Sequence, residues 1–99
     1  MRLAESERLI VRAAVEKHFG PQARVLLFGS RVDDSRRGGD IDLLVEVPHP
    51  VADPLAAAVD LEIDVMRGLG ERKVDVLLLH PGAEERAIHR IARKTGLPL

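Results

Sequence analysis

FGSRVDDSRRGGDIDLLVE, residues 28–46, is the stretch that decides the fold of this chain. An apolar run ends at the Gly29-Ser30 pair, a loop with charges of both signs follows, and a second apolar run begins with Asp40 and Asp42. Side chains two apart in a strand share a face and their Cα atoms lie roughly 6.6 Å apart, so the two carboxylates project side by side while Ile41 faces the core. The stretch therefore predicts two strands joined by a charged loop, with a carboxylate pair at the start of the second.

The rest of the chain predicts helices and strands in alternation. In the first helix, Val11, Val15 and Phe19 recur at helical spacing. Asp53 followed by Pro54 is typical of an N-cap with proline in the first turn. The apolar run before Gly29 suits a strand that is covered on both faces. The expected strands are residues 23–28, 40–47 and 73–79, and the expected helices are residues 6–20, 54–69 and 83–96.

The last predicted helix is amphipathic. Ile88, Ile91 and Ala92 share one of its faces. Glu84 and Glu85 at its start, and basic residues at its end, complement the helix dipole; the basic residues are Arg90, Arg93 and Lys94. The whole order is helix, strand, loop or short helix, strand, helix, strand, helix. We expect an α/β (α+β) fold, a small mixed sheet flanked by helices, with residues 1–99 as a single domain.

Composition excludes several classes of protein. The 99 residues suit one small domain with one core. Fifteen basic and 16 acidic side chains nearly cancel, which argues against direct nucleic-acid binding held by charge. There is no cysteine, so a disulfide scaffold and a thiolate zinc site are excluded. The charged N-terminal residues do not form a signal peptide or a membrane span, and we expect a soluble, cytoplasmic protein.

The paired aspartates point to metal chemistry. Two carboxylates on one strand face repel each other unless a cation lies between them, and Mg²⁺ prefers carboxylate oxygens completed by water and phosphate. Asp75 interrupts a third apolar run, where an unpaired charge would be costly to bury. If the second and third strands are neighbours, Asp75 joins Asp40 and Asp42 in a cluster suited to nucleotidyl transfer. Asp75 is then the proton acceptor or the ligand on the acceptor side.

Gly29 and Ser30 supply the other half of this predicted site. Glycine leaves room for a triphosphate, and backbone N–H groups at a strand-to-helix turn bind anions, to which the Ser30 hydroxyl adds a donor. Arg31 is a further candidate for contact with phosphate. We therefore expect nucleotide phosphates to bind at these three residues and metal to bind at the aspartates.

These motifs together resemble the polymerase-β-type nucleotidyltransferase superfamily. More closely, GSRVDDSRRGGDIDLLVE in so short a chain resembles the minimal nucleotidyltransferase (MNT) antitoxins, which are encoded beside HEPN-domain toxins. The resemblance implies the nucleotidyltransferase fold, ATP as substrate, Mg²⁺ as cofactor and a hetero-oligomer with a HEPN toxin. It also implies transfer of AMP to a tyrosine hydroxyl of that toxin, as in a type VII-like toxin-antitoxin pair. Many relatives have glycine in the loop where this chain has Asp33 or Asp34.

Other interpretations of the same residues remain open. Ser30 alone is typical of a helix N-cap, an isolated Asp-x-Asp is often solvated, and Asp64 is a rival of Asp75, although its spacing from Asp60 fits an exposed helix face. The four histidines share no metal-ligand spacing and favour surface or helix-end positions. The protein could neutralise a HEPN ribonuclease by binding alone, or transfer a nucleotide to a small-molecule acceptor. Because the chain is short, a protein that brings its own binding surface is the favoured acceptor.

Overall fold

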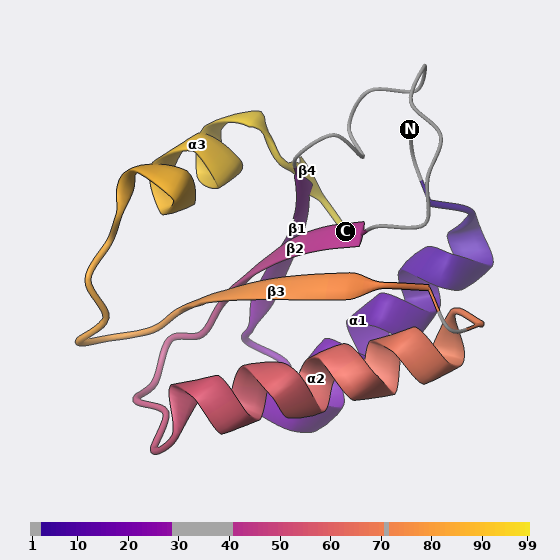
Figure 1. Ribbon diagram of the computed structural model, residues 1–99, viewed down its shortest axis with the longest axis horizontal. Coiled ribbons are helices and arrows are strands. Elements are labelled where there is room, and N and C mark those ends of the chain that lie inside the picture. Colours follow the sequence, from indigo (N-terminus) through magenta and orange to yellow (C-terminus); the bar gives the residue numbers. More distant parts are fainter. Residues whose placement is uncertain (1–2, 29–40, 71) are drawn as a thin grey trace.

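The computed structural model describes residues 3–28, 41–70 and 72–99, and these form helices and strands in the predicted alternation (Figure 1). The expected loop or short helix between the first two strands lies outside these residues. The elements are α1 (Glu5–Phe19), β1 (Arg24–Phe28), β2 (Ile41–Glu46), α2 (Pro54–Gly68), β3 (Val74–Leu79), α3 (Ala87–Thr95) and β4 (Leu97–Pro98).

The strands form a mixed sheet in the order β3-β2-β1-β4. β1 pairs antiparallel with β2 and with β4, whereas β2 and β3 are parallel because α2 carries the chain back across the sheet. The predicted fold class, a small mixed sheet flanked by helices, is confirmed. The starts of β2 and β3 and the end of β1 therefore meet at one end of the sheet.

Two helical layers cover the sheet. α1 and α2 lie together on one face and α3 lies on the other (Figure 1). Val25 and Leu27 of β1 belong to the larger core with α1 and α2, whereas Leu26 and Phe28 pack in a smaller core with Ala92 of α3. The alternation explains why β1 is a continuous apolar run, as predicted, because both of its faces are buried.

Local chemistry sets the bounds of α2. The Asp53 carboxylate accepts a hydrogen bond from the Ala56 N–H at 3.2 Å, and Pro54 occupies the first turn, where its missing N–H costs nothing. Leu61 and Val65, one turn apart, are fully buried against the sheet. The predicted cap and helix are confirmed, with the end one residue earlier than expected.

Two expectations for the last helix are wrong. α3 begins at Ala87, so Glu84 and Glu85 precede it and do not form its first turn. Ile88 and Ile91 are exposed, with relative accessibilities of 46% and 59%. The buried residues of α3 are instead His89 and Ala92. The small Ala92 packs closely against β1. The His89 Nδ1 accepts a hydrogen bond from the Arg86 N–H at 3.0 Å.

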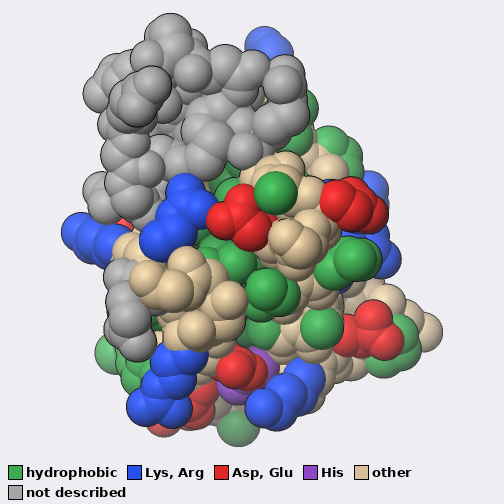
Figure 2. Space-filling model, turned by 90° about the vertical axis from the view of Figure 1, so that its right-hand side faces the viewer, with side chains coloured by type: hydrophobic (Ala, Val, Ile, Leu, Met, Phe, Trp, Pro, Cys, Tyr) green, Lys and Arg blue, Asp and Glu red, His purple; other side chains and the backbone are tan. Residues whose placement is uncertain are grey.

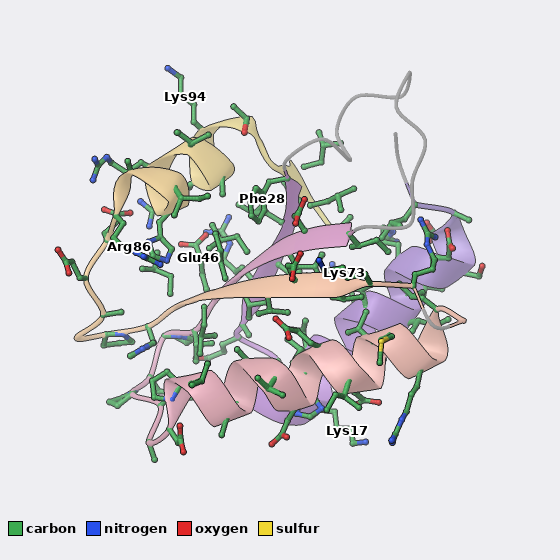
Figure 3. All side chains as sticks on the ribbon, in the orientation of Figure 1. Lys17, Phe28, Glu46, Lys73, Arg86 and Lys94 are labelled. Carbon is green, nitrogen blue, oxygen red and sulfur yellow. The ribbon has the colours of Figure 1, made fainter. Side chains whose placement is uncertain are left out.

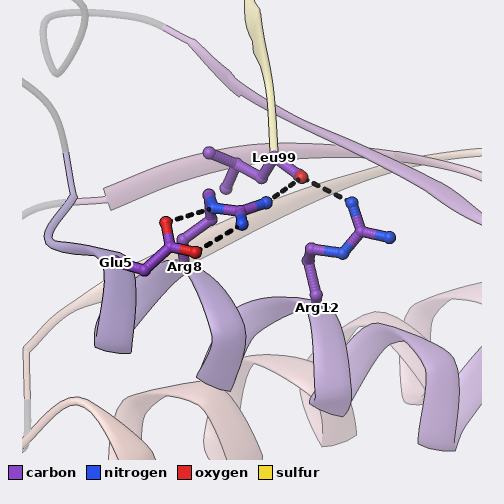
Figure 4. A network of polar contacts seen from close by, with 4 residues as sticks. All are labelled: Glu5, Arg8, Arg12 and Leu99. Carbon is purple, nitrogen blue, oxygen red and sulfur yellow. Dashed lines mark hydrogen bonds and ion pairs between the residues drawn. The ribbon is translucent and has the colours of Figure 1, made fainter.

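The short strand β4 was not predicted from the sequence. It pairs with Leu26 and Leu27 of β1, and the next residue, Leu99, donates its N–H to the Val25 carbonyl at 3.0 Å. Two guanidinium groups of α1 hold this segment, since Arg8 and Arg12 both donate to the backbone oxygen of Leu99, at 3.0 and 2.7 Å (Figure 4). A strand of two residues has no periodicity by which it could be predicted.

Charges of both signs are interspersed on the face shown in Figure 2, with hydrophobic side chains among them. Within the described residues, no helix is both long enough and apolar enough to cross a membrane.

Candidate active site

Asp42 and Asp75 are brought together by the parallel pairing of β2 and β3. They are partners in the register of the two strands, each at the second position of its strand. Neighbouring strands lie about 4.8 Å apart, and register partners on parallel strands project from the same face. The two carboxylates therefore stand side by side, although all of α2 separates them in the sequence. The structure shows the adjacency of strands on which the predicted cluster depends.

The core on the opposite face determines which way the aspartates point. Ile41 and Leu43, on either side of Asp42, are fully buried in the core under α1 and α2, and Val74 beside Asp75 is buried there too. Alternation along each strand then directs Asp42 and Asp75 to the face on which α3 lies. Asp42 is half-buried and Asp75 is exposed, so the carboxylate pair is accessible from solvent.

The end of β1 lies beside this pair. Phe28, the last residue of β1, is the register partner of Asp42, and Gly29 follows it directly in the chain. Figure 3 labels Phe28 and Lys73 at this end of the sheet and Glu46 at the other. The remaining predicted site residues lie outside the described residues; they are Gly29, Ser30, Arg31 and Asp40.

The donor set suits a divalent cation. Among the described residues, no group of three or more His, Cys, Asp or Glu side chains could hold a metal ion, and the predicted third carboxylate, Asp40, lies beyond them. Two carboxylates in register on adjacent strands nevertheless supply the hard oxygen ligands that Mg²⁺ prefers, and Mg²⁺ usually takes its other ligands from water and substrate phosphates. The described residues thus fit the metal that the sequence predicts.

Residues 10–95 match a family model described as "Nucleotidyltransferase domain". The matched range includes both aspartates and every predicted site residue. The chain belongs to the nucleotidyltransferase domain family. No curated protein matches its sequence.

Solved structures share the fold of this nucleotidyltransferase domain. One is a toxin-antitoxin crystallised with AMP-PNP, with a TM-score of 0.68, 18% identity, and coverage of 97% of this chain and 72% of the other. Another is a mutant of the toxin-antitoxin MntA-HpeT, with a TM-score of 0.61, 18% identity, and coverage of 97% and 71%. At this identity the likeness concerns the fold.

A contact that the sequence did not predict adjoins Asp75. Glu62 of α2 is half-buried, and its Oε2 accepts a hydrogen bond from the backbone N–H of Val76 at 2.8 Å. Val76 directly follows Asp75, so Glu62 contacts the backbone of the site without belonging to its face. Glu62 is two residues from both Asp60 and Asp64, so it lies off the helix face that they share, but the sequence alone does not show what it contacts.

Asp64, which the sequence left as an alternative to Asp75, does not lie beside Asp42 in the candidate site. It is on α2, which covers the other face of the sheet, and its Oδ2 is 2.9 Å from His18 Nε2 and 3.5 Å from Lys17 Nζ. The hydrogen bond from His18 lowers the pKa of the Asp64 carboxyl, and the nearby charge of Lys17 adds to this. Asp64 therefore joins α1 to α2.

The other histidines also have structural contacts. His89 is buried at the start of α3, as a helix-end residue, and His49 Nε2 lies 3.0 Å from the Phe19 carbonyl oxygen. His80 Nδ1 lies 3.0 Å from the carbonyl oxygen of Pro81. Neither of two surface hollows of about 290 and 280 Å³ is lined by Asp42 or Asp75. Both hollows adjoin the start of β1, at the end of the sheet away from the aspartates. The candidate site is therefore identified by the position of its carboxylates and not by a surface hollow.

Proposed function

We propose that this nucleotidyltransferase transfers AMP from ATP to a hydroxyl of a partner toxin and thereby acts as an antitoxin in the cytoplasm. The observation that carries the proposal is the register pairing of Asp42 with Asp75 in a chain of the nucleotidyltransferase domain family. The related structures support it, because both are toxin-antitoxins and one contains AMP-PNP, an analogue of ATP. The proposed partner is a HEPN-domain toxin and the proposed acceptor is a tyrosine.

The residues have distinct proposed roles. Asp40, Asp42 and Asp75 hold Mg²⁺, which when bound offsets the negative charge of the triphosphate. The segment after Phe28 binds the phosphates through Gly29, Ser30 and Arg31. The end of β1 and the starts of β2 and β3 meet at one end of the sheet, and we propose that the nucleotide is oriented there between the carboxylates and the backbone donors.

Asp75 serves the acceptor. In the transfer, the acceptor oxygen forms a bond to the α-phosphorus, the bond from that phosphorus to the bridging oxygen breaks, and pyrophosphate leaves. The hydroxyl proton passes to the Asp75 carboxylate, which acts as general base. Asp75 is exposed on the edge strand β3, so a hydroxyl on the surface of a folded partner can reach it without entering a closed pocket.

Intact mass measurement tests the proposal. The protein is incubated with ATP, Mg²⁺ and the product of the adjacent reading frame, and the partner is expected to gain the mass of AMP. Asp42→Asn and Asp75→Asn should each abolish the gain, whereas Asp60→Asn on the exposed side of α2 should leave it unchanged. A gain that persists in both site variants would refute the mechanism.

The same variants separate the enzyme from its alternatives. Neutralisation of the toxin by Asp42→Asn or Asp75→Asn without ATP would indicate an antitoxin that acts by binding alone. Transfer to a small hydroxyl compound, with none to the protein, would indicate a stand-alone transferase. Either result would refute AMP transfer to the toxin as the means of neutralisation.

A further inference from the structure

The edge position of β3 leaves part of its backbone without a strand neighbour. β3 is the outer strand of the sheet and pairs only with β2. Ile41 donates its N–H to the Lys73 carbonyl at 2.9 Å, and Val47 donates to the Leu79 carbonyl at 2.8 Å. In a parallel ladder, alternate residues bond to the neighbouring strand. The backbone groups of Asp75 therefore face β2, and those of Val76 face outward.

Glu62 satisfies the outward N–H of Val76. Its carboxylate, which reaches over the strand edge from α2, accepts this hydrogen bond at 2.8 Å. A hydrogen bond to an ionised acceptor is roughly twice as strong as one between neutral groups. Glu62 is half-buried, so water competes less for the bond than it would at a fully exposed position.

The contact constrains Asp75 through the peptide unit that joins it to Val76. This unit is planar, so its carbonyl and its N–H turn together. The ladder holds the Asp75 carbonyl toward β2, and Glu62 holds the Val76 N–H on the opposite side. With both sides bonded, the plane cannot rotate freely, and the direction in which the Asp75 side chain leaves the backbone is fixed.

Asp75 needs such a constraint because packing does not provide one. Its side chain is exposed, and within the described residues it makes no hydrogen bond or ion pair. Its distance from Asp42 is then set by the backbone alone. Carboxylates that share a metal must stay within a narrow range of distances, and mutation of residues that orient metal ligands typically lowers affinity or activity by about 10- to 100-fold.

We propose that Glu62 is a positioning residue of the metal site, which anchors the backbone beside Asp75 and so holds that carboxylate in register with Asp42. The proposal rests on the proposed function for its catalytic consequence. Its structural part concerns divalent cation binding and stands independently of which acceptor receives the nucleotide.

Three variants of Glu62 separate the hydrogen bond from the charge. Glu62→Gln keeps an acceptor oxygen of the same reach, Glu62→Asp keeps the charge but is one methylene shorter, and Glu62→Ala removes the acceptor. Asp60→Ala is the matched control, because Asp60 is an exposed acidic residue on the same helix and makes no hydrogen bond or ion pair within the described residues. Circular dichroism of each variant checks that the fold is retained.

The first measurement is amide hydrogen exchange at Val76. Exchange should be about tenfold faster in Glu62→Ala and Glu62→Asp, only about two- to threefold faster in Glu62→Gln, whose neutral oxygen is a weaker acceptor, and unchanged in Asp60→Ala. The second measurement is the affinity for Mn²⁺ without nucleotide, determined from the electron paramagnetic resonance signal of the free ion. Affinity should fall about tenfold in Glu62→Ala and Glu62→Asp and recover in Glu62→Gln.

Transfer assays then connect the contact to catalysis. The Mg²⁺ concentration for half-maximal transfer should rise in Glu62→Ala and Glu62→Asp, while KM for the partner stays unchanged. Unaltered Mn²⁺ affinity in both variants would overturn the proposal, even if exchange at Val76 were faster, because Glu62 would then only protect the strand edge. Absence of Mn²⁺ binding to wild type would overturn it as well. Normal Mn²⁺ binding without AMP transfer to the partner would instead count against the proposed function alone.

Discussion

Asp42 on β2 lies in register with Asp75 on β3, on the face of the sheet away from α1 and α2. This relationship depends on the parallel crossover through α2, which brings the starts of the two strands to the same end of the sheet. Apolar neighbours on both strands are buried on the opposite face. The core thus sets the spacing of the two carboxylates on the face of the sheet where α3 lies.

Replacing Asp75 should separate metal binding from folding. Asp75→Asn is expected to lower Mn²⁺ affinity at least tenfold. In metal-free protein it should raise the free energy of unfolding by roughly 0.5 kcal/mol, because it removes a like charge directly opposite Asp42. Urea denaturation with EDTA, and again with Mg²⁺, measures both effects. Equal stability gains of wild type and Asp75→Asn on addition of Mg²⁺ would show that Asp75 is not a ligand.

Leu44 should be among the core positions at which truncation to alanine costs the most unfolding free energy. It is fully buried on the central strand β2, in the small core with Ala92 of α3. Leu44→Ala is expected to cost about 2–5 kcal/mol of unfolding free energy, since it combines lost burial with a cavity. Leu55→Ala is the control, because Leu55 is 76% exposed, and it should cost less than about 0.5 kcal/mol. Urea denaturation would contradict the assignment if both variants lost similar stability.

The sequence predicts the elements of this fold better than it predicts their contacts. Continuous apolar runs identify β1 and β2, and Asp53 with Pro54 marks the start of α2, because these signals are local. The rotation of α3 is not local, since Ile88 and Ile91 match the core pattern as well as Ala92 does. Only the close approach to β1 selects the small side chain for burial.

The residues of the candidate site are likewise predicted better than the contacts between them. Asp42 is predicted by its spacing from Asp40, and Asp75 by the apolar run that it interrupts. Their register pairing could be predicted only if it were known that β3 is parallel and adjacent to β2. Glu62 could not be predicted, because its role arises from the unpaired edge of β3, and strand order is not encoded in any single segment.

The contact of Arg8 and Arg12 with Leu99 should hold β4 on the sheet. Because both guanidinium groups donate to the same backbone oxygen of Leu99, Arg8→Ala combined with Arg12→Ala should remove both of these hydrogen bonds. Exchange of the Leu99 amide, which bonds to Val25, is expected to become several-fold faster while global stability changes by about 1 kcal/mol or less. Arg67→Ala is the control, since Arg67 makes no polar contact within the described residues. Unchanged exchange in the double variant would mean that strand pairing alone holds β4.

The His18–Asp64 contact should make stability depend on pH in the acid range. The hydrogen bond from His18 lowers the pKa of Asp64 in the folded protein below its ordinary value of 3.8. Folding therefore favours the carboxylate, so the contribution to stability is present above the unfolded pKa and is lost as pH falls through the folded pKa. The difference in unfolding free energy between wild type and Asp64→Asn should be constant well above the unfolded pKa of 3.8 and shrink as the pH falls through that value toward the lowered folded pKa. Asp60→Asn, on the same helix, should show no such change, and parallel stability curves for wild type and Asp64→Asn across this range would refute the linkage.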